Sequence, residues 1–148
     1  MGERGARADP TGHMTTRVHV QWAGELRFDA GRPDGPTLRL DGSGATGPSP
    51  MDGLLSSLAG CMSADVVSIL EKRRTPVSAL TVDVTGERVE TFPKRYKHIT
   101  LHFTVVGTGL DQAQVEHAIE LSHTKYCSVG ASLRTDIVIE WTVDVRQT

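Results

Sequence analysis

One stretch of sequence decides the fold, residues 49–76, which read SPMDGLLSSLAGCMSADVVSILEKRRTP. Ser49 is a residue type that caps helix N-termini, and Pro50 suits the first helical position. Asp52 stands where a capping box places its acid, three residues after the cap. At the other end, a run of basic residues complements the helix dipole before Pro76 stops the helix. The stretch therefore predicts one long helix between these signals.

Apolar side chains recur along this stretch with the period of an α-helix, which predicts that one face of the helix is buried. They are Met51, Leu54, Leu55, Leu58, Met62, Val66, Ile69 and Leu70. At 1.5 Å per residue the helix is about 35–40 Å long, which is enough to cross a whole domain. We therefore expect a central helix that needs cover on more than one side.

The segments on both sides of this helix alternate apolar and polar residues, as half-buried strands do. The predicted strands are residues 18–22, 26–28, 37–40, 80–84, 98–105 and 137–145. A second helix is expected from Asp111, a good N-cap, to about residue 122. The resulting order is βββαββαβ with antiparallel alternation throughout. This order predicts an α+β fold in which helices pack against one face of curved antiparallel sheets.

Composition limits both the organisation of the chain and its function. Residues 1–14 contain almost nothing to bury and are expected to form a disordered leader, so that residues 15–148 make a single domain. The net charge is −2 with both signs dispersed, which argues against a nucleic-acid partner or a basic membrane surface. No apolar run is expected to reach the roughly 20 residues of a membrane helix, and no secretory signal is seen. We therefore expect a cytoplasmic protein.

The chain contains two cysteines, Cys61 in the long helix and Cys127 after the second helix, separated by 127 − 61 = 66 positions. No short C-x-x-C clip links them, so only the fold could bring them together. In a reducing compartment, two thiols kept in such settings suggest transient redox chemistry. The alternative is that both are buried thiols acting as small hydrophobic side chains.

Each cysteine has a route to activation. Cys61 shares a helical face with Leu58 and Asp65, and Ser57 and Asp65 flank it one turn away on either side. Because a buried carboxylate needs a partner, this face is expected to meet a polar, even cationic, pocket. Cys127 precedes a segment that could open a short helix, and the dipole of such a helix would favour its thiolate.

Four stretches carry a resemblance to a known family. They read PSPMDGLLSSLAGC (48–61), DVVSIL (65–70), GER (86–88) and KYCSV (125–129). On these stretches the sequence resembles the OsmC/Ohr family over nearly its whole length, and it looks most like the YhfA-like branch. The resemblance implies an intertwined homodimer in which two central helices cross between curved sheets.

The resemblance also implies an activity and gives each cysteine a role. By position, Cys61 matches the peroxidatic cysteine of the family and Cys127 the resolving one, close together near the dimer interface. The implied substrates are hydroperoxides, especially organic ones, and an external dithiol would restore both thiols. No cofactor is implied, and no ligand pair has the spacing that a structural zinc site favours. The alternatives are a non-catalytic OsmC-like dimer that binds an apolar ligand at the subunit interface and a purely structural dimer.

The sequence departs from the family pattern at one position. The Ohr and OsmC branches carry a Glu ten residues before the first cysteine, where it pairs with an N-terminal Arg, but here that position is Met51. The neighbouring acid, Asp52, points about 100° away around the helix and is better suited to capping. The residues that could support Cys61 are Asp65, Arg27, Arg88 and Asp52, with Arg17 and Arg39 as further cations.

Overall fold

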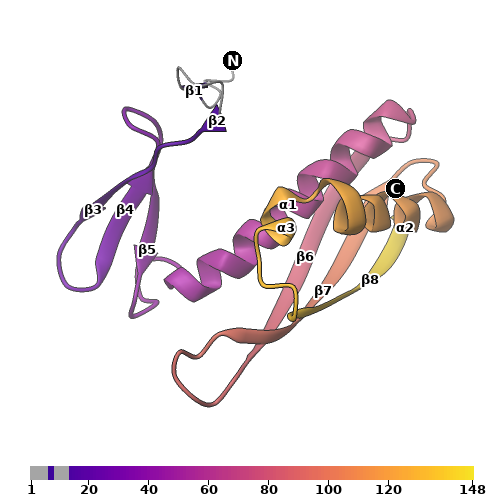
Figure 1. Ribbon diagram of the computed structural model, residues 1–148. Coiled ribbons are helices and arrows are strands. Elements are labelled where there is room, and N and C mark those ends of the chain that lie inside the picture. The colour runs from indigo at the N-terminus through magenta and orange to yellow at the C-terminus, as the bar shows by residue number, and fades with distance from the viewer. Residues whose placement is uncertain (1–6, 9–13) are drawn as a thin grey trace. The chain divides into compact units, whose positions relative to one another are not determined.

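The computed structural model describes residues 7–8 and 14–148 of the chain. The chain divides into two compact units, residues 1–53 and 54–148 (Figure 1). The boundary between them falls near the beginning of the long helix α1 (Pro50–Lys72).

The predicted leader lies mostly outside the described residues, which do not include residues 1–6 and 9–13. Its described part consists of two short strands, β1 (Arg7–Ala8) and β2 (Met14–Thr15), which pair antiparallel. The prediction of disorder over the rest of residues 1–14 stays a prediction.

The first unit contains a three-stranded antiparallel sheet made of β3 (His19–Trp22), β4 (Arg27–Gly31) and β5 (Leu38–Asp41), in that order. The hairpin predicted between the first two strands is confirmed, because β3 and β4 pair antiparallel. Its turn contains Gly24 at a φ of 96°, a left-handed conformation that glycine adopts without strain. All three strands predicted before the helix are therefore present.

The loop between β5 and α1 is organised around a single carboxylate. Asp41 is only 2% exposed, and it accepts hydrogen bonds from the hydroxyls of Ser43 at 2.7 Å and Thr46 at 2.6 Å. It also accepts from the backbone N–H groups of the same two residues. These bonds favour the charged form and hold the pKa of Asp41 well below its usual range. A Gly-, Ser- and Thr-rich loop is thereby fixed at the entrance to the long helix.

Helix α1 begins and ends where its sequence signals predict. The Asp52 backbone N–H donates to Ser49 Oγ at 3.1 Å, and the Ser49 backbone N–H donates to Asp52 Oδ2 at 3.1 Å. This reciprocal pair is the capping box that the sequence predicts. The buried residues of α1 are Leu58, Ala59, Met62, Val66 and Leu70.

The expectation that no stretch of the chain is long and apolar enough for a membrane helix is wrong for α1. With 23 residues it is long and apolar enough, by length and composition, to cross a membrane, although core helices of soluble proteins have the same property. The glycines, serines and alanines between its larger side chains break up the visible apolar run but leave the average hydropathy high. Only 28% of its most apolar window is buried within the described chain. No large apolar side chain of α1 is fully exposed, and those that are not buried are partly covered.

The second unit contains a sheet in the order β6-β7-β8, with β6 (Val77–Arg88) and β7 (Tyr96–Gly107) forming a long antiparallel hairpin. The third strand, β8 (Val138–Gln147), pairs with β7 in parallel, so the prediction of antiparallel pairing throughout is wrong for this pair. Parallel neighbours need a long crossover. Here the helical segment of residues 112–131 supplies it.

The crossover begins with α2 (Gln112–Leu121), which is capped by Asp111 as predicted. It continues through a π-helical turn, η1 (Ser122–Tyr126), and a short helix, α3 (Ser128–Ala131). Figure 1 shows this connection running back over the sheet toward the start of β8.

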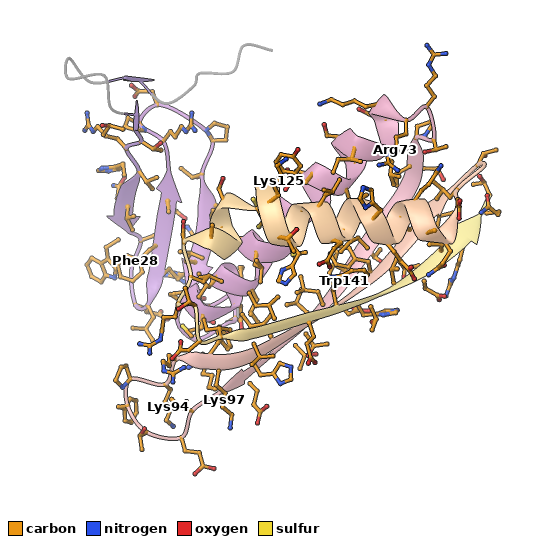
Figure 2. The ribbon with its side chains drawn as sticks, turned by 45° about the vertical axis from the view of Figure 1, so that its right-hand side comes forward. Phe28, Arg73, Lys94, Lys97, Lys125 and Trp141 are labelled. Atoms are coloured by element: carbon orange, nitrogen blue, oxygen red, sulfur yellow. The ribbon has the colours of Figure 1, made fainter. Side chains whose placement is uncertain are left out.

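The core of the second unit lies between the sheet and its two long helices. The central strand β7 contributes side chains that are fully buried: Ile99, Leu101, Phe103 and Val105. Helix α1 lies on the face that these residues occupy, because a Cβ at Gly86, whose partner is Ile99, would meet Leu55 at 3.1 Å. Helix α2 covers β8, where Trp141 points toward it and donates from Nε1 to Glu120 at 3.2 Å (Figure 2).

The capping box predicts the effect of a single substitution. Ser49→Ala removes the side chain that accepts from the Asp52 N–H, and it should lower the free energy of unfolding by about 1 kcal/mol. Denaturant unfolding followed by circular dichroism measures this difference. Ser68→Ala, at an exposed position inside the same helix, is the control and should cost nothing, since alanine is the better helix former. Equal stability of Ser49→Ala and wild type would show that the cap does not hold the helix.

Candidate functional site

The fold of the second unit brings the two cysteines together. Cys61 lies in the middle of α1 and Cys127 lies between η1 and α3, and both are free thiols. The Cys61 side chain lies close enough to Cys127 to raise its pKa. A Cβ at Gly130 of α3 would lie 3.5 Å from both Cys127 Sγ and Leu58, one turn before Cys61 on α1. The segment that carries Cys127 is therefore packed on the turn of α1 that carries Cys61.

A π-helical turn places Cys127 at this position. After α2, the chain widens so that the Cys127 N–H donates to the carbonyl of Ser122, five residues earlier, at 2.8 Å. Cys127 then caps the short helix that the sequence predicts, and its Sγ accepts from the N–H of Gly130 at 3.3 Å. Single π turns are frequent at functional sites, because they redirect one side chain without ending the helical path.

One hydrogen bond holds this turn against α1. Ser122 is completely buried, and its hydroxyl donates to Asp65 Oδ2 at 2.8 Å. Asp65 lies four residues after Cys61 and thus on the same face of α1. The same serine therefore bonds to α1 through its hydroxyl and to the Cys127 amide through its carbonyl. The polar partner predicted for Asp65 exists, and it is a hydroxyl group instead of a cation.

The surroundings of Cys127 raise its pKa. The main cause is burial, since only 5% of the residue is exposed, and Cys61 and Asp65 nearby oppose a negative charge. The Gly130 N–H lowers the pKa but does not compensate for burial. The helix terminus thus acts on the Cys127 pKa in the expected direction, but burial outweighs it. Cys127 is held as a neutral thiol, while Cys61 is only half-buried.

A small pocket of about 190 Å³ opens beside the cysteine pair. It is formed by the π turn, α3 and the beginning of β8. Its lining residues are His123, Thr124, Lys125, Cys127, Gly130, Ala131 and Ile139. Cys127 therefore faces this pocket, and Cys61 is not among the residues that line it.

Three of the other cations and acids predicted to support Cys61 have structural partners of their own. Asp52 belongs to the capping box, and the Arg88 guanidinium lies 5.5 Å from the centre of the Tyr96 ring. In the first unit, Arg39 is bound by both oxygens of Asp29 at 2.9 Å. Arg27 lies on β4, and its buried Nε has no hydrogen-bond partner among the described residues. The role of a cation beside Cys61 therefore stays a prediction for Arg27 and Arg88.

The electrostatic part of the site can be tested on the isolated Cys127 thiol. In a Cys61→Ser background, the pKa of Cys127 should stay above that of an ordinary cysteine, because burial is the main cause of its shift. Adding Asp65→Asn removes a nearby negative charge and should lower this pKa. Thiolate absorbance followed against pH measures both values. Asp83→Asn, at an exposed position on β6, is the matched control and should leave the titration unchanged. A Cys127 pKa that does not respond to Asp65→Asn would contradict the proximity of the two groups.

Comparisons with known proteins agree with this architecture. The model of the OsmC-like protein family matches residues 42–142. Protein YhfA of Escherichia coli strain K12 is 40% identical over 130 residues, which cover 87% of this chain and 97% of YhfA. The crystal structure of a hypothetical protein from Aquifex aeolicus VF5 is 30% identical with a TM-score of 0.76, covering 90% of this chain and 98% of that one.

A more distant structure has the same fold. The organic hydroperoxide resistance protein OsmC from Legionella pneumophila aligns with a TM-score of 0.64 at 19% identity, covering 88% of this chain and 96% of that one. With a family model that matches two thirds of the chain and a relative that matches nearly its whole length, this protein belongs to the OsmC-like family.

Proposed function

We propose that this protein is a thiol-dependent hydroperoxide reductase that uses Cys61 as the peroxidatic cysteine and Cys127 as the resolving one. The observation that carries the proposal is the proximity of two thiols that lie far apart in the sequence. Membership of the OsmC-like family and the fold shared with a hydroperoxide resistance protein support a peroxide-related redox role.

The first step uses the more accessible thiol. The Cys61 thiolate attacks one oxygen of the hydroperoxide, the O–O bond breaks, and the leaving alkoxide takes a proton and departs as an alcohol. Cys61 becomes a sulfenic acid, so the sulfur is oxidised by two electrons while the peroxide is reduced by two. The fully buried Leu58 and Met62 lie within one turn of Cys61 on α1 and make this part of the helix apolar. They favour an alkyl hydroperoxide over hydrogen peroxide, since burial of apolar surface contributes about 25 cal/mol per Å².

The second step uses the neutral thiol. Cys127 attacks the sulfenic sulfur of Cys61, an S–S bond forms, and the sulfenic oxygen leaves as water with the thiol proton. The bond between Ser122 and Asp65 keeps the Cys127 segment on α1 while this happens. An external dithiol then reduces the disulfide and restores both thiols.

The two cysteine variants should behave differently. Cys61→Ser should consume no cumene hydroperoxide, because serine provides no anion at neutral pH. Cys127→Ser should consume about one equivalent of cumene hydroperoxide and then stall as a sulfenic acid that dimedone traps. This variant should react faster with cumene hydroperoxide than with hydrogen peroxide. Intact mass spectrometry measures the adduct, and thermal unfolding checks that both variants fold.

Other outcomes have definite meanings for this assignment. A dimedone adduct found only on Cys61→Ser would reverse the roles of the two thiols. With no adduct on either folded variant and no peroxide consumed by the wild type, the protein is not a peroxidase. In that case the alternative, a non-catalytic OsmC-like dimer that binds an apolar ligand, would take its place.

We further propose that the protein acts as a homodimer in which a second copy covers α1. Only 28% of the most apolar window of this helix is fully buried by its own chain, and the large apolar residues outside that share are partly exposed. The exposed side of α1 includes Gly60, Ala64 and Ser68, spaced four residues apart, and such small residues allow two helices to approach closely. The sheet of the first unit also exposes large apolar side chains, which are Val18, Val20, Trp22, Leu26 and Leu38.

A bulky side chain in this stripe should weaken the dimer. Within one chain, a Cβ at Gly60 meets no atom within 4 Å, so Gly60→Leu is compatible with the fold of the chain itself. In a dimer it should force the helices apart and raise the dissociation constant at least about tenfold, which corresponds to 1.4 kcal/mol. Analytical ultracentrifugation measures this change. Ala113→Leu, exposed on α2, is the control. A folded wild-type monomer at micromolar concentration would overturn the proposal.

A further inference from the structure

The pocket beside the cysteine pair is bordered by one cysteine of the pair and not by the other. Cys127 lines it and Cys61 does not, although the two thiols interact. A molecule that enters the pocket therefore meets Cys127. A thiol that must react with the Cys61–Cys127 disulfide has a defined approach from this side.

We propose that this pocket binds a small anionic thiol reductant, whose thiolate attacks Cys127 Sγ of the oxidised pair. This inference rests on the proposed function, because it requires a disulfide between the two cysteines. In the step, an S–S bond forms between the reductant and Cys127, the bond between Cys127 and Cys61 breaks, and the electron pair leaves on Cys61 as a thiolate. A second reductant thiol then displaces Cys127, which takes up a proton, and the reductant departs as its disulfide.

The leaving-group order agrees with this direction of attack. In thiol–disulfide exchange, the sulfur with the lower thiol pKa leaves more readily. The pKa of the Cys127 thiol is raised by burial and by neighbouring negative charge, so Cys127 is a poor leaving group. Attack on Cys61 would have to expel Cys127, whereas attack on Cys127 leaves it bonded and expels Cys61. The position of the pocket and the leaving-group order therefore favour the same sulfur.

The charge of the lining residues favours an anion. Lys125 and His123 are the basic residues of the lining, and no lining residue is acidic. Lys125, labelled in Figure 2 on the π turn after α2, keeps its ammonium 5.3 Å from the ring centre of Tyr126. The carboxylate that acts on Cys127, Asp65, is held from the α1 side by Ser122. A reductant that carries an acidic group besides its thiolate is thus attracted toward the pocket.

The first experiment locates the attacked sulfur. The disulfide is formed with diamide, which makes peroxide turnover unnecessary, and is then treated briefly with 2-mercaptoethanesulfonate. Acid quenching, alkylation of the freed thiol and peptide mass spectrometry identify the mixed disulfide. We expect the probe on Cys127 and the alkyl group on Cys61. The probe mainly on Cys61 would overturn this inference.

The same oxidation separates this inference from the proposed function. If diamide forms no Cys61–Cys127 disulfide, both proposals fail. If the disulfide forms and the probe maps to Cys127 while cumene hydroperoxide is not consumed, only the peroxidase proposal fails.

The second experiment tests the pocket itself through rates of disulfide reduction. Lys125→Gln should slow reduction by 2-mercaptoethanesulfonate about two- to five-fold, as expected for one exposed charge, and leave reduction by the neutral 2-mercaptoethanol unchanged. Ala131→Phe fills the pocket and should slow both reductants by more than roughly tenfold, an estimate based on lost access to the sulfur. Ala113→Phe, on exposed α2, controls for the added ring. Equal effects of Lys125→Gln on both reductants, or no effect of Ala131→Phe, would overturn the pocket assignment.

Discussion

The arrangement of the site depends on one hydrogen bond, from the buried hydroxyl of Ser122 to the carboxylate of Asp65. The fully buried Ser122 hydroxyl has lost contact with water and needs a hydrogen-bond partner, which the partly buried Asp65 carboxylate provides. Asp65 fixes this contact on the Cys61 face of α1, and the π turn then places Cys127 five residues beyond Ser122. The meeting of the two thiols is therefore a consequence of how the crossover between β7 and β8 docks on α1.

This docking also separates the properties of the two thiols. Cys127 is buried, serves as the cap of α3 and has a raised pKa, so it is kept neutral until it is needed. Cys61 is partly accessible, and under the proposed mechanism it is the thiol that meets the hydroperoxide. A resolving thiol that ionised first would compete for oxidant and would be a better leaving group. Burial makes Cys127 a weak nucleophile on its own, and in the proposed pair the same burial keeps it from reacting with the oxidant before Cys61 does.

The local parts of this structure could be predicted from the sequence. The capping box of Ser49 and Asp52, the course of α1 and the short helix after Cys127 follow from residues close together in the chain. The parallel pairing of β8 could not be predicted, because alternation marks a strand but not the direction of its neighbour. The π turn at Ser122 and the raised pKa of Cys127 depend on packing between distant segments, which local patterns do not report. Patterns in the sequence therefore predicted the local elements better than the packing around the two cysteines.

The central claim is that the fold sets Cys61 and Cys127 close enough to form a disulfide within one chain during peroxide reduction. The most direct test is to count free thiols before and after one equivalent of cumene hydroperoxide, with non-reducing peptide mapping of the product. The account predicts the loss of both thiols and an intrachain Cys61–Cys127 disulfide. Two thiols that survive the treatment, or a disulfide only between chains, would contradict it.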